Sequence, residues 1–191
     1  EHVYYFNAVA LVPLFRRHGL EIFRIEKLPI HGGSLRIHAS KAGVRTVESS
    51  VHAIIEEETS AGVTSAGYYE NFSRAVVGLK ISLLELLAQL IGKGYSIAAY
   101  GASAKGSTLL NYCGIGREIL SFIVDRSTYK QGKFSPGMHL PILSPEALME
   151  KRPDYTLLLT WNFADEILAQ QKEYSDAGGL FITPVPQPRI I

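Results

Sequence analysis

The segment YSIAAYGASAKGSTLL, residues 95–110, predicts a short strand that turns directly into a helix. Tyr95 to Tyr100 is an apolar run of strand length, and the loop from Gly101 to Gly106 leads straight into helix-forming residues. In an open parallel sheet, ligands bind in the crevice at the carboxyl ends of the strands, where this loop would lie. The segment therefore predicts the first strand–helix unit of an α/β sheet.

The rest of the second half continues the alternation of strands and helices. Further strands are expected over 120–125, 141–143, 155–160 and 180–184, and further helices over 145–151 and 165–177. A long amphipathic helix is expected over 66–91, and its apolar face must be covered by other elements. This order predicts the fold class α/β, a Rossmann-like parallel sheet with helices on both faces.

A smaller segment is expected before the long helix. Asn7 can cap a short helix that ends at Gly19, and alternating apolar residues over 21–28 and 34–39 predict a hairpin. The polar stretch 40–64 is interpreted as a linker that carries a short helix. We therefore expect two parts, with residues 1–64 as helix, hairpin and linker, and residues 65–191 as the Rossmann-like domain.

Composition argues against several classes of protein. With 19 Lys and Arg against 18 Asp and Glu, the chain has no broad positive field, so no nucleic-acid partner is expected. The single cysteine, Cys113, excludes an internal disulfide and a thiolate zinc cluster within this chain, and it fits a reducing cytoplasm. The longest apolar runs are interrupted well short of the roughly 20 residues that a membrane helix needs, so no membrane partner is expected.

The glycine loop is the first candidate ligand site. Gly101 and Gly106 would let the backbone approach a phosphate, whose charge the helix amino terminus favours. Ser103 and Lys105 lie between them and could bind the same group. Asp125 ends the next strand, 24 positions after Gly101, which is about the offset of the ribose-binding acid in dinucleotide folds. In the other interpretation the glycines only permit a tight turn, Lys105 is solvated and Asp125 caps a turn.

The start of the chain and the hairpin turn form a second candidate region. His2 can take up a proton near neutral pH, and the neighbouring Glu1 can orient it. The residues of the turn that could contact a ligand are His31, Gly32, Ser34 and Arg36. A commonplace Glu-His pair and a tight turn with an exposed histidine are the alternatives that residue types alone leave open.

Longer motifs around these residues resemble a known family. Glu1-His2, His18-Gly19-Leu20 and Leu28-Pro29-x-His31-Gly32-Gly33-Ser34-Leu35-Arg36 resemble the junction at which the methyl-donor domain ends in sugar C-methyltransferases. The runs Tyr100-Gly101-Ala102-x-Ala104-Lys105-Gly106 and Ile142-Leu143-Ser144-Pro145, with Asp125 between them, resemble the carboxyl-terminal domain of that family. Residues 1–64 would then contain the tail of the methyl-donor domain.

The resemblance implies S-adenosylmethionine-dependent methylation of the carbon beside the keto group of a nucleotide-linked ketosugar, in deoxysugar biosynthesis. It implies that His2 is the base, that Glu1 is its acidic neighbour, and that the glycine loop contacts the nucleotide-sugar. S-adenosylmethionine would bind mainly to upstream domains of the same polypeptide, which are the other expected partners. Zinc would bind only in an amino-terminal domain, and the fragment alone would be inactive.

Two functions from other classes remain open at this point. The chain could be an NAD-dependent oxidoreductase, or a non-catalytic nucleotide-binding or assembly domain. The loop lacks the middle glycine of the Gly-x-Gly-x-x-Gly pattern, so an NAD pyrophosphate would lose its closest approach to the backbone. This departure weakens the oxidoreductase interpretation without selecting between the other two.

Overall fold

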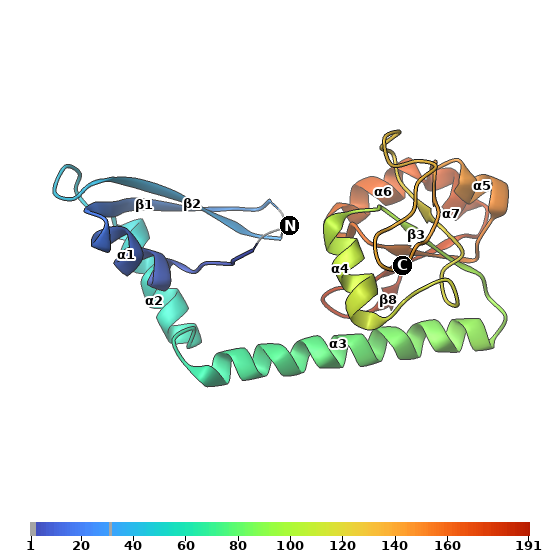
Figure 1. Cartoon of the computed structure of the whole chain (residues 1–191), viewed down its shortest axis with the longest axis horizontal. Coiled ribbons are helices and arrows are strands. Elements are labelled where there is room, and N and C mark those ends of the chain that lie inside the picture. The colour runs from blue at the N-terminus through green and yellow to red at the C-terminus, as the bar shows by residue number, and fades with distance from the viewer. Residues whose placement is uncertain (1–2, 31) are drawn as a thin grey trace. The chain divides into compact units, whose positions relative to one another are not determined.

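The computed structural model describes residues 3–30 and 32–191, which form two compact units (Figure 1). The first unit ends at Ala75, and the second runs from Val76 to Ile191. The division falls inside the longest helix of the chain. Each unit has its own buried apolar core and is described by itself.

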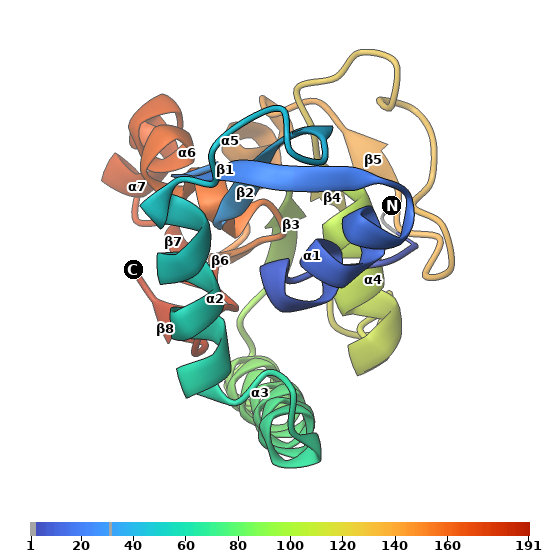
Figure 2. The same ribbon diagram turned by 90° about the vertical axis from the view of Figure 1, so that its left-hand side faces the viewer.

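The first unit is an antiparallel hairpin with two helices packed on it. Its elements are α1 (Ala8–Arg17), β1 (Leu20–Leu28), β2 (Ser34–Lys41) and α2 (Ser49–Ala61). Asn7 caps α1 as predicted, since its side-chain oxygen accepts a hydrogen bond from the Ala10 amide at 2.8 Å. Both helices contact β1 and one another on the same side of the hairpin (Figure 2).

The polar segment expected as a linker contains a helix that belongs to this core. Val51 and Ile54 of α2 lie three positions apart on one helix face and are buried with Ile22 and Ile25 of β1. Glu58, on the same helix, accepts hydrogen bonds from the Ala8 and Val9 amides, both at 2.9 Å. Helix α2 therefore closes the first unit and satisfies the amino terminus of α1.

The second unit is built on a six-stranded sheet in the order β5-β4-β3-β6-β7-β8. The strands are β3 (Ile97–Tyr100), β4 (Ile123–Val124), β5 (Ile142–Leu143), β6 (Tyr155–Leu158), β7 (Leu180–Thr183) and β8 (Arg189–Ile190). The first five run parallel, and β8 pairs antiparallel with β7. The predicted α/β class with a mostly parallel sheet is confirmed, and β8 is an edge strand that the sequence pattern did not predict.

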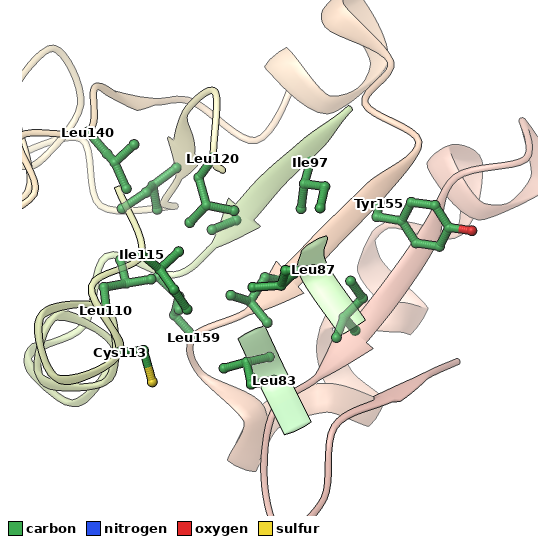
Figure 3. Packing of buried hydrophobic residues seen from close by; sticks show 14 of the residues in the cluster. Leu83, Leu87, Ile97, Leu110, Cys113, Ile115, Leu120, Leu140, Tyr155 and Leu159 are labelled. Atoms are coloured by element: carbon green, nitrogen blue, oxygen red, sulfur yellow. The ribbon is translucent and has the colours of Figure 1, made fainter. Parts of the chain in front are cut away.

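Helices cover both faces of this sheet. They are α3 (Ala66–Gly92), α4 (Ala104–Cys113), α5 (Ala147–Lys151), α6 (Ala164–Gln170) and α7 (Lys172–Asp176), with the short 3-10 turn η1 (Trp161–Phe163) before α6. The helix expected over 165–177 is thus divided at Gln171 into α6 and α7. Figure 3 shows Leu83 and Leu87 of α3 and Leu110 of α4 packed with Ile97 of β3. On the other face, α5, α6 and α7 pack on Ala98 and Tyr100.

Helix α3 is also long and apolar enough to cross a membrane, judged by length and composition alone. Core helices of soluble proteins meet the same criteria, and Leu83, Leu87 and Leu90 of α3 are buried in the core of the second unit. The charged residues Lys80 and Glu85 interrupt its apolar sequence. These three leucines pack α3 on the core of the second unit, whereas only 17% of its apolar window is buried.

Candidate functional site

The glycine loop lies at the switch point of the sheet. Strand β3, which ends at Tyr100, has β4 on one side and β6 on the other, and the chain reaches β4 first through α4. In doubly wound sheets, a crevice opens where the connections that follow two neighbouring strands run in opposite directions. Strand β3 is followed by the loop Gly101 to Gly106, β4 by Asp125, and β6 by Thr160. These residues therefore meet at the carboxyl edge of the sheet.

Both glycines of the loop are required by close packing against the end of β6. Gly101 has a φ of +93°, and a Cβ atom there would lie 2.5 Å from the Thr160 Oγ1 atom. At Gly106, a Cβ atom would lie 2.6 Å from the Cβ of Leu159. Separations below 3.0 Å are essentially never seen for real Cβ atoms. These contacts favour the interpretation in which the glycines permit a tight turn.

Most backbone amides of the loop already donate hydrogen bonds inside the fold. The Gly101 amide donates to the Val124 carbonyl at 2.7 Å, and the Ser103 amide donates to the Gly101 carbonyl at 2.8 Å. Ser103 also caps α4, because its Oγ atom accepts from the Gly106 amide at 2.9 Å. With the Ala102 amide, four of the six loop amides are therefore engaged, and the loop backbone is a poor cradle for a phosphate.

Asp125 fastens the loop to the end of β4. Its Oδ2 atom accepts from the Ala102 amide at 2.7 Å and pairs with the Lys130 Nζ at 3.2 Å. Its Oδ1 atom accepts from the Ser127 amide at 2.8 Å. The residue is buried, and Lys130 also donates to the Ala102 carbonyl at 2.9 Å. Both carboxylate oxygens thus have partners within the chain, and contact with a ribose stays a prediction.

Lys105 points toward an aromatic ring. Its Nζ atom lies 4.7 Å from the ring centroid of Trp161, which is a favourable cation–π distance. It forms no ion pair within residues 3–30 and 32–191. Phosphate binding by Lys105 stays a prediction.

A pocket opens on the α6 side of the loop, which we call the switch-point pocket. It has a volume of about 270 Å³. Its lining residues are Tyr100, Gly101, Asp125, Arg126, Thr160, Phe163, Glu166, Ile167 and Gln170. Arg126 Nη1 is already 3.2 Å from the Glu166 Oε1 and 3.3 Å from the Gln170 Oε1. Burial raises the pKa of Tyr100, with nearby Arg126 opposing the shift.

A second pocket of about 240 Å³ opens beside the first turn of α4, and we call it the lysine pocket. Its lining residues are Ala102, Ser103, Ala104, Ser107, Tyr129, Lys130, Lys133, Phe134, Pro136 and Ile142. The Lys133 Nζ lies 3.4 Å from the ring centroid of Tyr129. The long connection between β4 and β5 supplies half of these lining residues, because it folds back onto α4.

The candidate residues of the hairpin belong to the first unit. Gly32 adopts a positive φ of 86°, and the Ser34 hydroxyl donates to the Ile30 carbonyl at 3.2 Å. Arg36 Nη1 lies 3.3 Å from the Glu26 Oε2, and Arg24 lies 2.6 Å from the other oxygen of Glu26. The guanidinium of Arg36 therefore has a carboxylate partner on the hairpin.

Three further candidate residues, Glu1, His2 and His31, lie outside the described residues. The structure brings Gly101, Ser103, Gly106 and Asp125 together in the second unit. Gly32, Ser34 and Arg36 lie together in the first.

Sequence reasoning missed several residues around the loop. Thr160 ends one predicted strand and Arg126 directly follows another, so their position at the carboxyl edge could have been found from the strand pattern. Tyr129 and Lys133 carried no such signal, because only the folding of the β4–β5 connection brings them to α4. Within residues 3–30 and 32–191, no group of three or more His, Cys, Asp or Glu side chains is placed to hold a metal ion.

Comparison with known proteins gives a family match over most of the chain. Residues 29–186 match the family model described as C-methyltransferase C-terminal domain. The chain is 38% identical to the C-methyltransferase NovU of Streptomyces niveus, over 100% of this chain and 46% of NovU. The chain thus spans less than half the length of that curated relative.

Among solved structures, the chain is similar to UDP-D-quinovosamine 4-dehydrogenase from Vibrio fischeri, and the match covers 49% of this chain and 79% of the dehydrogenase chain. The identity is 16% and the TM-score 0.35. A score this low bears on neither the fold nor the function.

Proposed function

The chain belongs to the family of C-methyltransferase C-terminal domains, and from that membership we propose that it is the carboxyl-terminal part of an S-adenosylmethionine-dependent enzyme that methylates a nucleotide-linked ketosugar. The observation that carries the proposal is the family match over residues 29–186. The identity of 38% to a C-methyltransferase over the whole chain supports it. Within the described residues 3–30 and 32–191, no feature favours the oxidoreductase alternative.

The chemistry that we propose begins with removal of a proton from the carbon beside the keto group. A ketone acidifies that carbon because the resulting negative charge is shared with the carbonyl oxygen. His2 takes the proton, and Glu1 orients its imidazole, which is a role that histidine performs well near neutral pH. S-adenosylmethionine would supply the methyl group: as the carbon forms its bond to the methyl carbon, the bond between that methyl and the sulfonium sulfur would break, and S-adenosylhomocysteine would leave with the electron pair. A positioned base contributes on the order of 10² to 10⁴ in rate.

The second unit does not fit S-adenosylmethionine in the way a dinucleotide fold holds its ligand. Four loop amides donate within the fold, and Asp125, the acid that would meet a ribose, binds the Ala102 and Ser127 amides and Lys130. We therefore propose that the methyl donor binds to a part of the full-length enzyme outside residues 1–191. We propose that zinc also binds outside residues 1–191. The single thiol of this chain, Cys113, is buried, and its burial raises its pKa.

In this proposal the second unit holds the nucleotide-sugar beside the glycine loop. The switch-point pocket and the lysine pocket open on either side of the loop, and Ser103 and Lys105 lie between the strand end and α4. Contact of the hairpin residues Gly32, Ser34 and Arg36 with substrate stays a prediction. The 191-residue chain alone would not turn over substrate, and the whole enzyme would work in the cytoplasm.

Replacement of His2 by Asn in the full-length enzyme tests this mechanism. Asparagine keeps a polar side chain of similar size but cannot take up the proton, so we expect methyl transfer to fall by 100-fold or more, on the order of general-base catalysis. Calorimetry should show unchanged binding of S-adenosylmethionine. The assay follows transfer of a labelled methyl group to a nucleotide-linked 4-ketosugar.

Two outcomes of that assay would count against the proposal in different ways. Turnover by His2→Asn equal to that of the unmodified enzyme would remove His2 as the base. If the unmodified enzyme methylates no nucleotide-linked ketosugar, the proposed substrate class is wrong.

A further inference from the structure

The two pockets beside the glycine loop differ in the sign of the charge that lines them. Asp125 and Glu166 line the switch-point pocket together with a single cation, Arg126, which is already 3.2 Å from Glu166. The lysine pocket is lined by Lys130 and Lys133 and by no acidic residue. An anion is therefore attracted to the lysine pocket and repelled by the carboxylates of the switch-point pocket.

Of the two lysines, Lys133 is the one whose ammonium group is available to bind an anion. The Lys130 Nζ is occupied by the Ala102 carbonyl at 2.9 Å and by Asp125 at 3.2 Å. Lys133 is exposed and rests over the ring of Tyr129, and no carboxylate in the described part of the chain pairs with it. A flexible ammonium of this kind can turn to a phosphate oxygen at little cost.

The size and rim of the lysine pocket suit one part of a larger ligand. Its volume of about 240 Å³ is below the roughly 300 to 1,000 Å³ of sites that enclose a whole small molecule. Two aromatic rings stand exposed among its lining residues, Tyr129 at 80% and Phe134 at 58%. Exposed rings offer a stacking surface to a planar base.

We propose that the lysine pocket is the diphosphate subsite of the nucleotide-sugar site, with Lys133 as the cation that binds the diphosphate. The diphosphate lies on the α4 side of the glycine loop and not over its backbone, whose amides are mostly engaged. The inference rests on the proposed function for the identity of its ligand. The recognised chemistry is a pair of linked phosphates, which free pyrophosphate and a nucleoside diphosphate share.

The test is calorimetric titration of the chain with pyrophosphate, dTDP and thymidine. We expect pyrophosphate and dTDP to bind, thymidine to bind far more weakly, and added salt to weaken both anions. Lys133→Gln should raise the dissociation constants of pyrophosphate and dTDP roughly tenfold or more, since a charge-assisted hydrogen bond is lost. Lys133→Arg, which keeps the charge, should restore most of the affinity.

Two matched variants separate this pocket from the rest of the surface. Arg126→Gln removes the one cation of the switch-point pocket, and Lys93→Gln removes an exposed lysine at the end of α3. Both should leave pyrophosphate and dTDP binding unchanged. The inference would be overturned if Lys133→Gln bound pyrophosphate and dTDP as tightly as the unmodified chain. It would also be overturned if Arg126→Gln, and not Lys133→Gln, lost this binding. Absence of binding to the unmodified chain, or binding of pyrophosphate but not dTDP, would also overturn it.

Kinetics of the full-length enzyme keep the inference distinct from the proposed function. In an enzyme that methylates a nucleotide-linked ketosugar, Lys133→Gln should raise the KM for that substrate more than it lowers kcat. An unchanged KM would contradict the diphosphate subsite while leaving the function intact. A failure of the unmodified enzyme to methylate would contradict the function, whatever the pyrophosphate titration shows.

Discussion

Asp125 and Gly101 show how single residues build the crevice of the second unit. The sequence predicted both at the carboxyl edge of the sheet, because each ends an apolar run of strand length. It could not predict that Asp125 would bind the Ala102 amide at 2.7 Å, since that bond joins positions 23 residues apart. The same limit applies to Thr160, whose contact with Gly101 exists only because β3 and β6 are neighbours.

Gly101→Ala tests the packing role of the glycine. The new Cβ would overlap Thr160, and alanine at a φ of +93° is strained, so we expect a loss of unfolding free energy of about 2 to 4 kcal/mol. Gly178→Ala is the matched control, because Gly178 has a φ of +97° but open space around it. It should cost only the strain, about 1 to 2 kcal/mol.

Urea denaturation followed by fluorescence of Trp161, the single tryptophan, measures both variants. Equal losses in the two variants would show that the contact with Thr160 contributes nothing.

At the scale of elements, the strand and helix pattern was predictable wherever apolar runs ended at glycine or proline. The long helix, the glycine loop and the parallel strands follow from such signals. The two-residue strand β8 and the division between α6 and α7 do not, since neither has a periodic pattern of its own. Helix α2 was interpreted as part of a linker because its polar residues outnumber Val51 and Ile54, the two that are buried against the hairpin.

Glu58→Ala tests the joining of α2 to α1. The carboxylate accepts two amides at the amino terminus of α1, so its removal leaves the Ala8 and Val9 amides unpaired and should cost about 1 to 2 kcal/mol. Glu57→Ala is the control, since Glu57 makes only an exposed pair with Lys27, worth about 0 to 1 kcal/mol.

Hydrogen exchange of the α1 amides is the measurement for this pair. We expect faster exchange at Ala8 and Val9 in Glu58→Ala and no change in Glu57→Ala. Equal exchange in both variants would show that the two hydrogen bonds do not hold α1.

At the scale of the whole molecule, the chain is a family domain that spans 46% of its curated relative. The residues proposed for chemistry, Glu1 and His2, are the first two of the chain, whereas the switch-point pocket and the lysine pocket lie in the second unit. The sequence motifs predicted the family, because they extend over both parts of the chain. They predicted a phosphate at the glycine loop and not in the lysine pocket proposed above, since the lining of that pocket depends on how the β4–β5 connection folds.

The proposed function requires that this chain binds the nucleotide-sugar and neither the methyl donor nor a nicotinamide cofactor. Calorimetric titration of residues 1–191 with a nucleotide-sugar, S-adenosylmethionine and NAD tests it most directly. We expect heat of binding with the nucleotide-sugar alone. Binding of S-adenosylmethionine or NAD, or binding of none of the three, would contradict the account.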